Sequence, residues 1–140
     1  QNREKYCPMV MRSVINGDIV TIHSDPMLTK PGSRFYLHCR NAASAVLFLL
    51  SLKHPPMERY NIVGEREIDN LTLAQMIADI VGLPLKYVLV DAHSSRPGHD
   101  TRYALSGEKL RNAGFRFPVS FERSLEETVR WTLRNPTWLI

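Results

Sequence analysis

The stretch Arg96-Pro97-Gly98-His99-Asp100-Thr101-Arg102-Tyr103-Ala104 decides how the fold is read, because it sets two arginines and a histidine around a Pro-Gly turn. We expect a β-branched strand before it, over residues 86–90, and a short helix after it, capped by Ser106 and ended by Gly114. Paired guanidinium N–H donors can hold phosphate, and a Pro-Gly turn makes neighbouring side chains converge. No G-x-G-x-x-G or Walker-type glycine run occurs in the chain. The pattern therefore predicts an anion-gripping segment rather than the opening of a dinucleotide-binding fold.

Hydrophobic periodicity predicts the elements that surround this stretch. The expected helices cover residues 3–15, 42–52, about 72–81 and 121–135, with Asn41, Asn70 or Thr72, and Ser120 as caps. Because Pro8 lies inside the first of them, we expect a kink there or a later start near Cys7. The expected strands cover residues 19–23, 34–38, 59–63 and 86–90. We expect helix 42–52 to be the core helix, through Ala42, Ala45, Val46, Leu49 and Leu50, and the last helix to turn Leu125, Val129 and Leu133 inward. The predicted fold is an α/β domain with a small sheet and about five helices.

Length and composition set limits on domain organisation and on partners. At 140 residues, 44% hydrophobic and 23% charged, the chain fits one domain, residues 1–140, with a core of its own. No stretch is apolar enough to span a bilayer and no signal-peptide core follows the start, although a removed leader would look the same. We therefore expect a cytoplasmic protein with no membrane contact. The net charge of +4 is scattered, which argues against nucleic-acid binding.

The histidines and cysteines do not predict a metal site. Cys7 and Cys39 form no C-x-x-C pair, and His93 and His99 alone are too few ligands for zinc. We expect reduced thiols and no bound metal.

Several motifs resemble one known family. Besides the Arg96–Asp100 segment, these are Arg3-Glu4-Lys5-Tyr6-Cys7-Pro8, Ser33-Arg34-Phe35-Tyr36-Leu37 and Tyr60-Asn61-Ile62-Val63-Gly64. Together they resemble the C-terminal, substrate-binding part of the extended short-chain dehydrogenase/reductase family, the NAD-dependent epimerases and dehydratases, and within it the dTDP-glucose 4,6-dehydratase branch. The resemblance covers nearly the whole chain and implies the substrate-binding subdomain without its Rossmann lobe.

The resemblance also implies a pocket for a nucleotide-diphosphate sugar. Its expected residues are Glu4, Lys5, Arg34, Asn61, Arg96 and His99. Glu4 and Lys5 would lie near the nucleobase and the two arginines would hold the pyrophosphate. This chain departs from the family in having Phe35 where an aspartate is usual, and Arg40-Asn41 where an acidic pair is usual. Local charge is therefore shifted toward positive.

Catalysis in this family depends on sequence motifs that do not occur in this chain. A Rossmann lobe binds NAD, and a tyrosine-x-x-x-lysine pair acts while the sugar is oxidised at C4, loses water and regains the hydride. None of the five tyrosines here is followed by lysine four residues later. We expect no catalytic residue and no cofactor bound by this chain, with NAD belonging to the complete enzyme. The expected partners are the Rossmann lobe, in cis or in trans, and further copies of the chain through the apolar surface left uncovered.

Other interpretations stay open on the sequence alone. The loop arginines can pair with Asp91, Asp100 or Glu108, and Asn61 can cap a turn. Glu4 and Lys5 can be ordinary charges of a first helical turn. The alternative function is a non-enzymatic protein-interaction module derived from the same domain. Neither the nucleobase nor the sugar follows from the sequence.

Overall fold

The computed structural model describes residues 4–53, 58–95, 97–98 and 100–139. Its helices are α1 (Tyr6–Asn16), α2 (Cys39–Ser51), α3 (Asn70–Val81), α4 (Ala92–Ser95), α5 (Glu108–Asn112) and α6 (Phe121–Arg134), followed by the 3₁₀ turn η1 (Pro136–Trp138). Its strands are β1 (Val20–Ser24), β2 (Ser33–Arg34), β3 (Ile68–Asp69), β4 (Tyr87–Asp91) and β5 (Arg102–Tyr103). The α/β class with small sheets is confirmed. None of the described helices is both long and apolar enough to cross a membrane.

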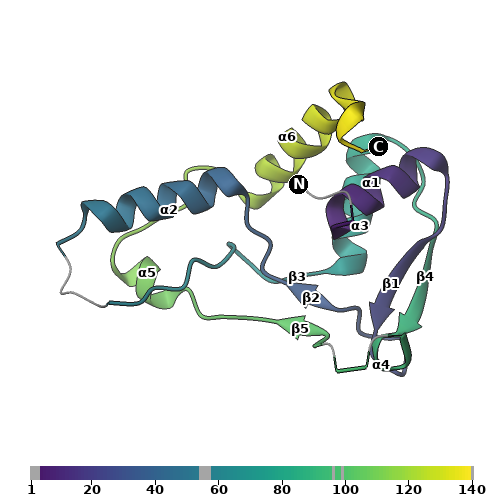
Figure 1. Ribbon diagram of the computed structural model, residues 1–140, viewed down its shortest axis with the longest axis horizontal. Coiled ribbons are helices and arrows are strands. Elements are labelled where there is room, and N and C mark those ends of the chain that lie inside the picture. The colour runs from purple at the N-terminus through teal and green to yellow at the C-terminus, as the bar shows by residue number, and fades with distance from the viewer. Residues whose placement is uncertain (1–3, 54–57, 96, 99, 140) are drawn as a thin grey trace.

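Two small sheets organise the strands (Figure 1). Strands β1 and β4 pair in parallel, with Val20 opposite Tyr87 and Ser24 opposite Asp91. Strand β2 lies between β3, which runs antiparallel to it, and β5, which runs parallel. The second sheet therefore places Ser33 and Arg34 of β2 beside β5, which follows the Pro-Gly turn in the sequence.

Helix α3 is the centre of the main hydrophobic core. Its side chains Leu73, Ala74, Ile77 and Ala78 are fully buried, and they pack with residues of α1, β1 and α6. The helix begins at Asp69, whose carboxylate accepts from the Thr72 amide at 2.8 Å and the Thr72 hydroxyl at 2.6 Å. It ends at Gly82, where φ is +82°. The cap predicted at Asn70 or Thr72 was wrong. The N-cap is Asp69, at the end of β3, one position before Asn70.

Helix α2 is not the core helix that the sequence predicts. Ala45, Phe48 and Leu49 face the protein, whereas Val46, Leu47 and Leu50 are 46%, 67% and 77% exposed. The helix is apolar on all sides, so the sequence periodicity could not select the covered face. Its cap also differs, since His38 Nδ1 accepts from the Arg40 amide, and Asn41 instead donates from inside the helix to the Val119 carbonyl at 2.7 Å.

A second, smaller core supports α2. Ala45, Leu110 and Phe115 are buried together, and partly buried Phe48, Leu49, Tyr60, Ile62 and Phe117 pack around them. We call α2, α5 and residues 58–64 the arm. Figure 1 shows the arm on the left, displaced along the long axis from α1, α3 and the β1–β4 pair on the right.

Two predicted strands are shorter than expected or absent. Residues 59–63 lie in the arm but form no ladder with any described strand, and of residues 34–38 only Arg34 lies in a strand, β2. Helix α1 begins at Tyr6, close to the later start expected near Cys7, which puts Pro8 in the first turn, where no backbone N–H is needed. Leu133 is 37% exposed rather than inward-facing, and Thr132 is buried in its place.

Candidate anion-binding site

Arg34 lies against the segment that follows the Pro-Gly turn. Its Nη1 donates to the carbonyls of Ser33 at 2.6 Å and Thr101 at 2.7 Å, and its Nη2 lies 3.4 Å from the Asp100 carbonyl. The guanidinium also stacks on the Tyr103 ring, 4.1 Å from its centroid. The parallel pairing of β2 with β5 produces this contact, because it sets Arg34 opposite Tyr103.

The charge of Arg34 has no carboxylate partner in the described part of the chain. Its contacts there are carbonyl oxygens and an aromatic face, which orient the guanidinium without neutralising it. Such a cation, held in place and partly buried, is suited to bind an anion. Arg34 is thus a cation without a described carboxylate partner, and the pyrophosphate contact that the resemblance implies for it stays a prediction.

Arg102, by contrast, already has a partner. Its Nε and Nη2 donate to the two Glu67 oxygens at 2.7 and 2.8 Å, and the Ser33 hydroxyl donates to the same carboxylate at 2.5 Å. These donors lower the pKa of Glu67 from its ordinary 4.5 to about 2. The ion-paired alternative is therefore right for Arg102, although none of its expected partners is the one used. Glu67 was missed because it lies 35 positions away in sequence.

Arg96 and His99 lie outside the described residues, so their roles stay predictions. The described neighbours show where the turn begins and ends. Gly98 has φ +79°, the left-handed conformation that glycine adopts freely, and Asp100 ends the turn beside Arg34. The turn between α4 and β5 therefore closes next to the Arg34 guanidinium.

Glu4 and Lys5 stand at the start of α1, close to the same sheet. The adjacent Tyr6 hydroxyl donates to the Asn70 carbonyl at 2.6 Å, and the Asn70 amide donates to the Gly32 carbonyl at 2.8 Å. Tyr36 donates to Asn70 Oδ1 at 2.5 Å. Burial raises the pKa of both phenols, which remain neutral donors. Asn70 therefore ties the first turn of α1 to the end of β2 that carries Arg34.

Asn61 is placed differently from the other predicted residues. It lies in the arm, it is exposed, and its Nδ2 donates to the Ser106 carbonyl at 3.2 Å. No described contact joins it to Arg34. This hydrogen bond joins residues 45 positions apart, so it is not the local turn cap that was the alternative for Asn61.

A sizeable cavity lies elsewhere, between α1, α6 and residues 36–39. It measures about 740 Å³ and is lined by Met11, His38, Cys39, Glu127, Trp131 and Trp138 among others. No lysine or arginine of the described chain lines it, and two glutamates do. The described lining thus offers a diphosphate no cationic side chain, and the cavity is distinct from the predicted anion site at Arg34.

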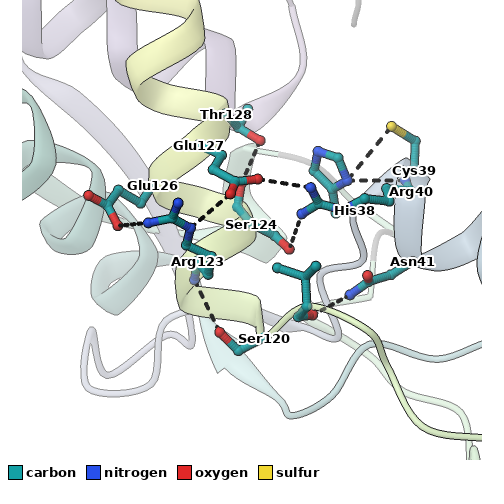
Figure 2. A network of polar contacts seen from close by, with 11 residues as sticks. His38, Cys39, Arg40, Asn41, Ser120, Arg123, Ser124, Glu126, Glu127 and Thr128 are labelled. Atoms are coloured by element: carbon teal, nitrogen blue, oxygen red, sulfur yellow. Dashed lines mark hydrogen bonds and ion pairs between the residues drawn. The ribbon is translucent and has the colours of Figure 1, made fainter.

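A polar network that includes the lining residues His38, Ser124 and Glu127 joins the start of α2 to α6 (Figure 2). Arg40 Nη1 donates to Glu127 at 2.9 Å and its Nη2 donates to the Ser124 hydroxyl at 3.3 Å. Burial and the Arg40 charge lower the pKa of His38, which caps α2 as a neutral acceptor. The positive charge expected at Arg40 is therefore neutralised by α6, a pairing that the sequence spacing of 87 residues hid.

Comparisons with known proteins identify this architecture. No family model matches the chain. A dTDP-glucose 4,6-dehydratase of Streptomyces niveus is 33% identical over 139 residues, 99% of this chain and 39% of that protein. The dTDP-glucose 4,6-dehydratase 1 of Escherichia coli K12 is 30% identical over 97% of this chain and 38% of its own length. The solved dTDP-glucose 4,6-dehydratase of Bacillus anthracis, in complex with NAD, matches 99% of this chain and 42% of its own at 30% identity, with a TM-score of 0.78.

The chain is homologous to the C-terminal part of extended short-chain dehydrogenases/reductases. The expected resemblance is confirmed. UDP-glucuronic acid 4-epimerase of Bacillus cereus, an extended short-chain dehydrogenase/reductase at 17% identity and a TM-score of 0.78, shows the shared fold. The chain spans about two fifths of the length of the relatives it matches.

Proposed function

We propose that this chain is the nucleotide-sugar-binding part of an NAD-dependent sugar 4,6-dehydratase or epimerase, and that it is not catalytic alone. One observation carries the proposal: Arg34 presents a fixed guanidinium without a carboxylate partner among the described residues, beside the turn that holds Arg96 and His99. Homology to the dTDP-glucose 4,6-dehydratases supports a nucleoside diphosphate as the anion.

The predicted site residues would contact different parts of the nucleotide. Arg34 Nη1 already donates to the Ser33 and Thr101 carbonyls, so Arg34 would bind a phosphate oxygen through the remaining N–H groups of its guanidinium. Arg96 and His99 would add further donors to the phosphates, and Glu4 and Lys5 would approach the base from the start of α1. Asn61 would join only if the pocket extends to the arm.

NAD does not fit the residues of this chain. Dinucleotides are bound by a glycine-rich turn between a strand and a helix, and neither strand of the β1–β4 pair leads into such a turn. NAD, which accepts and returns hydride in such enzymes, would therefore be held by a Rossmann lobe. In the isolated chain, binding of the sugar nucleotide should occur without turnover, because a phosphate grip does not stabilise the reacting carbons.

The second candidate function is a non-enzymatic interaction module. The exposed apolar side chains of α2 favour it, because such surfaces promote association. It predicts association without nucleotide binding, which separates it from the first proposal.

Calorimetric titration with dTDP, UDP and GDP tests the binding function. The Arg34→Gln variant should bind about 10- to 100-fold more weakly, the range expected when a charge-assisted hydrogen bond is lost. Arg134→Gln, at an exposed position near the end of α6, is the matched control and should bind like the parent chain. Absence of binding for all three nucleotides at millimolar concentration, or equal affinity of the two variants, would reject the proposal.

A further inference from the structure

The residues that orient the Arg34 guanidinium are grouped around Arg102. Arg34 donates to the carbonyls of Ser33 and Thr101 and stacks on the Tyr103 ring. Thr101 and Tyr103 are the two chain neighbours of Arg102, and Ser33 lies opposite Arg102 in the pairing of β2 with β5. The direction of the Arg34 guanidinium therefore depends on where Ser33 and Arg102 are held.

Glu67, directly before β3, contacts both of these residues. Its Oε1 accepts from the Ser33 hydroxyl at 2.5 Å and from Arg102 Nε at 2.7 Å. Its Oε2 accepts from Arg102 Nη2 at 2.8 Å. A carboxylate that binds a guanidinium through both oxygens fixes its direction as well as its distance. One side chain thus joins paired positions on β2 and β5.

The backbone alone gives this pairing little support. Strands β2 and β5 have two residues each, and both residues of β5 are exposed. The Ser33 amide donates to the Thr101 carbonyl at 2.9 Å, and this is the same carbonyl that accepts from Arg34. A ladder of this length contains few hydrogen bonds. The three hydrogen bonds of Glu67 are therefore a large part of what sets Ser33 beside Arg102.

We propose that Glu67 is a positioning residue of the anion site, which holds Ser33 and Arg102 together and through them orients the Arg34 guanidinium toward the phosphates. Of the two arginines in this sheet, Glu67 also neutralises Arg102 and leaves Arg34 to the anion. A long side chain that is ordered in advance loses less affinity on binding than one that is ordered by the ligand. This inference rests on the proposed function, because it takes the anion to be the phosphates of a nucleotide.

Calorimetric titration of a Glu67→Asp variant tests this role. Aspartate keeps the negative charge but is one methylene shorter, so the contacts with Ser33 and Arg102 should not form together. The ligand is whichever of dTDP, UDP and GDP binds the parent chain most tightly. Its affinity should fall about 2- to 12-fold, the range expected when a long side chain must be ordered on binding. Glu122→Asp is the matched control and should bind like the parent chain, because Glu122 is ion-paired with Arg66 on α6, away from Arg34.

A second background shows whether Glu67 acts through Arg34. In an Arg34→Gln chain, Glu67→Asp should cause no further loss of affinity, because the side chain that it orients is gone. An equal loss in both backgrounds would mean a general structural role and would overturn the inference. Unchanged or tighter binding by Glu67→Asp in the parent background would also overturn it.

A measurement without ligand keeps the two proposals separable. The Tyr103 ring lies 4.1 Å from the guanidinium carbon of Arg34, so its ring current should shift the NMR signal of Arg34 Hε away from that of a free arginine. Glu67→Asp should move this signal back, and Glu122→Asp should leave it in place. An unmoved signal in Glu67→Asp would overturn the inference. If the parent chain binds none of the three nucleotides, the proposed function fails, and the NMR comparison still decides whether Glu67 holds Arg34.

Discussion

Gly64 offers a sharp test of how the arm is joined to the rest of the molecule. Its backbone crosses residues 35 and 36 so closely that an added Cβ would lie 2.9 Å from the Phe35 carbonyl carbon and closer still to the Tyr36 carbonyl oxygen. Real Cβ contacts essentially never fall under 3.0 Å, and both opposing atoms belong to the backbone, so no side-chain rotation relieves the overlap. Gly64→Ala must therefore displace the main chain at the end of the arm, where residue 64 crosses residues 35 and 36.

We expect Gly64→Ala to lower the free energy of unfolding by about 3 kcal/mol, the upper end of the usual cost of overpacking. For a chain of this size, that corresponds to a fall in Tm of about 10 °C. Gly82→Ala is the control, because Gly82 has φ +82° with nothing within 4 Å of the added atom, and its cost of about 1–2 kcal/mol is conformational only.

Urea unfolding followed by circular dichroism measures both variants under the same conditions. The expected order is a larger loss at Gly64 than at Gly82. If Gly64→Ala is as stable as Gly82→Ala or more so, the close crossing of residue 64 over the backbone of residues 35 and 36 is wrong.

Three other predictions concern charge, packing and thiols. Because the pKa of Glu67 is depressed from 4.5 to about 2, its ion pair should stabilise the fold fully above pH 4.5 and lose that effect as the pH falls toward 2; Glu67→Gln should flatten this part of a plot of Tm against pH, and an unchanged slope would contradict the pairing. Val129→Ala, at a fully buried site, should cost about 2 kcal/mol in urea unfolding, and Leu133→Ala on the same helix, at 37% exposure, should cost clearly less. Exposed Cys39 should react with a thiol reagent at neutral pH well before Cys7, because burial raises the pKa of Cys7 to about 11; fast reaction of the one thiol left in a Cys39→Ser variant would refute this.

Helices with clear local signals could be predicted from sequence. Ser120 caps α6 as expected, its hydroxyl accepting from the Arg123 amide, and Gly82 ends α3. These features depend on residues within one or two turns of each other. The strand at β4 was also predicted, because its β-branched run is local information.

Long-range pairing was beyond the reach of sequence reasoning. Glu67 and Glu127 neutralise Arg102 and Arg40 from 35 and 87 positions away, so neither carboxylate could be assigned as a partner in advance. For the candidate site, the sequence identified Arg34 as a candidate cation. It could not tell that Arg102, a few residues from the turn, was already committed to a carboxylate.

The chain alone thus determined its longer helices, the Ser120 cap of α6, the Gly82 end of α3 and the basic residues at the Pro-Gly turn, because propensity, capping and turn chemistry act between near neighbours. Tertiary structure decided which apolar faces are covered and which charges are left without a counterion. Helix α2 gives the physical reason. It has apolar residues on every side, so its sequence does not indicate which face is buried. Ala45 and Leu49 are in the interior because they pack near Phe115 and α5, whereas Leu47 and Leu50 face outward.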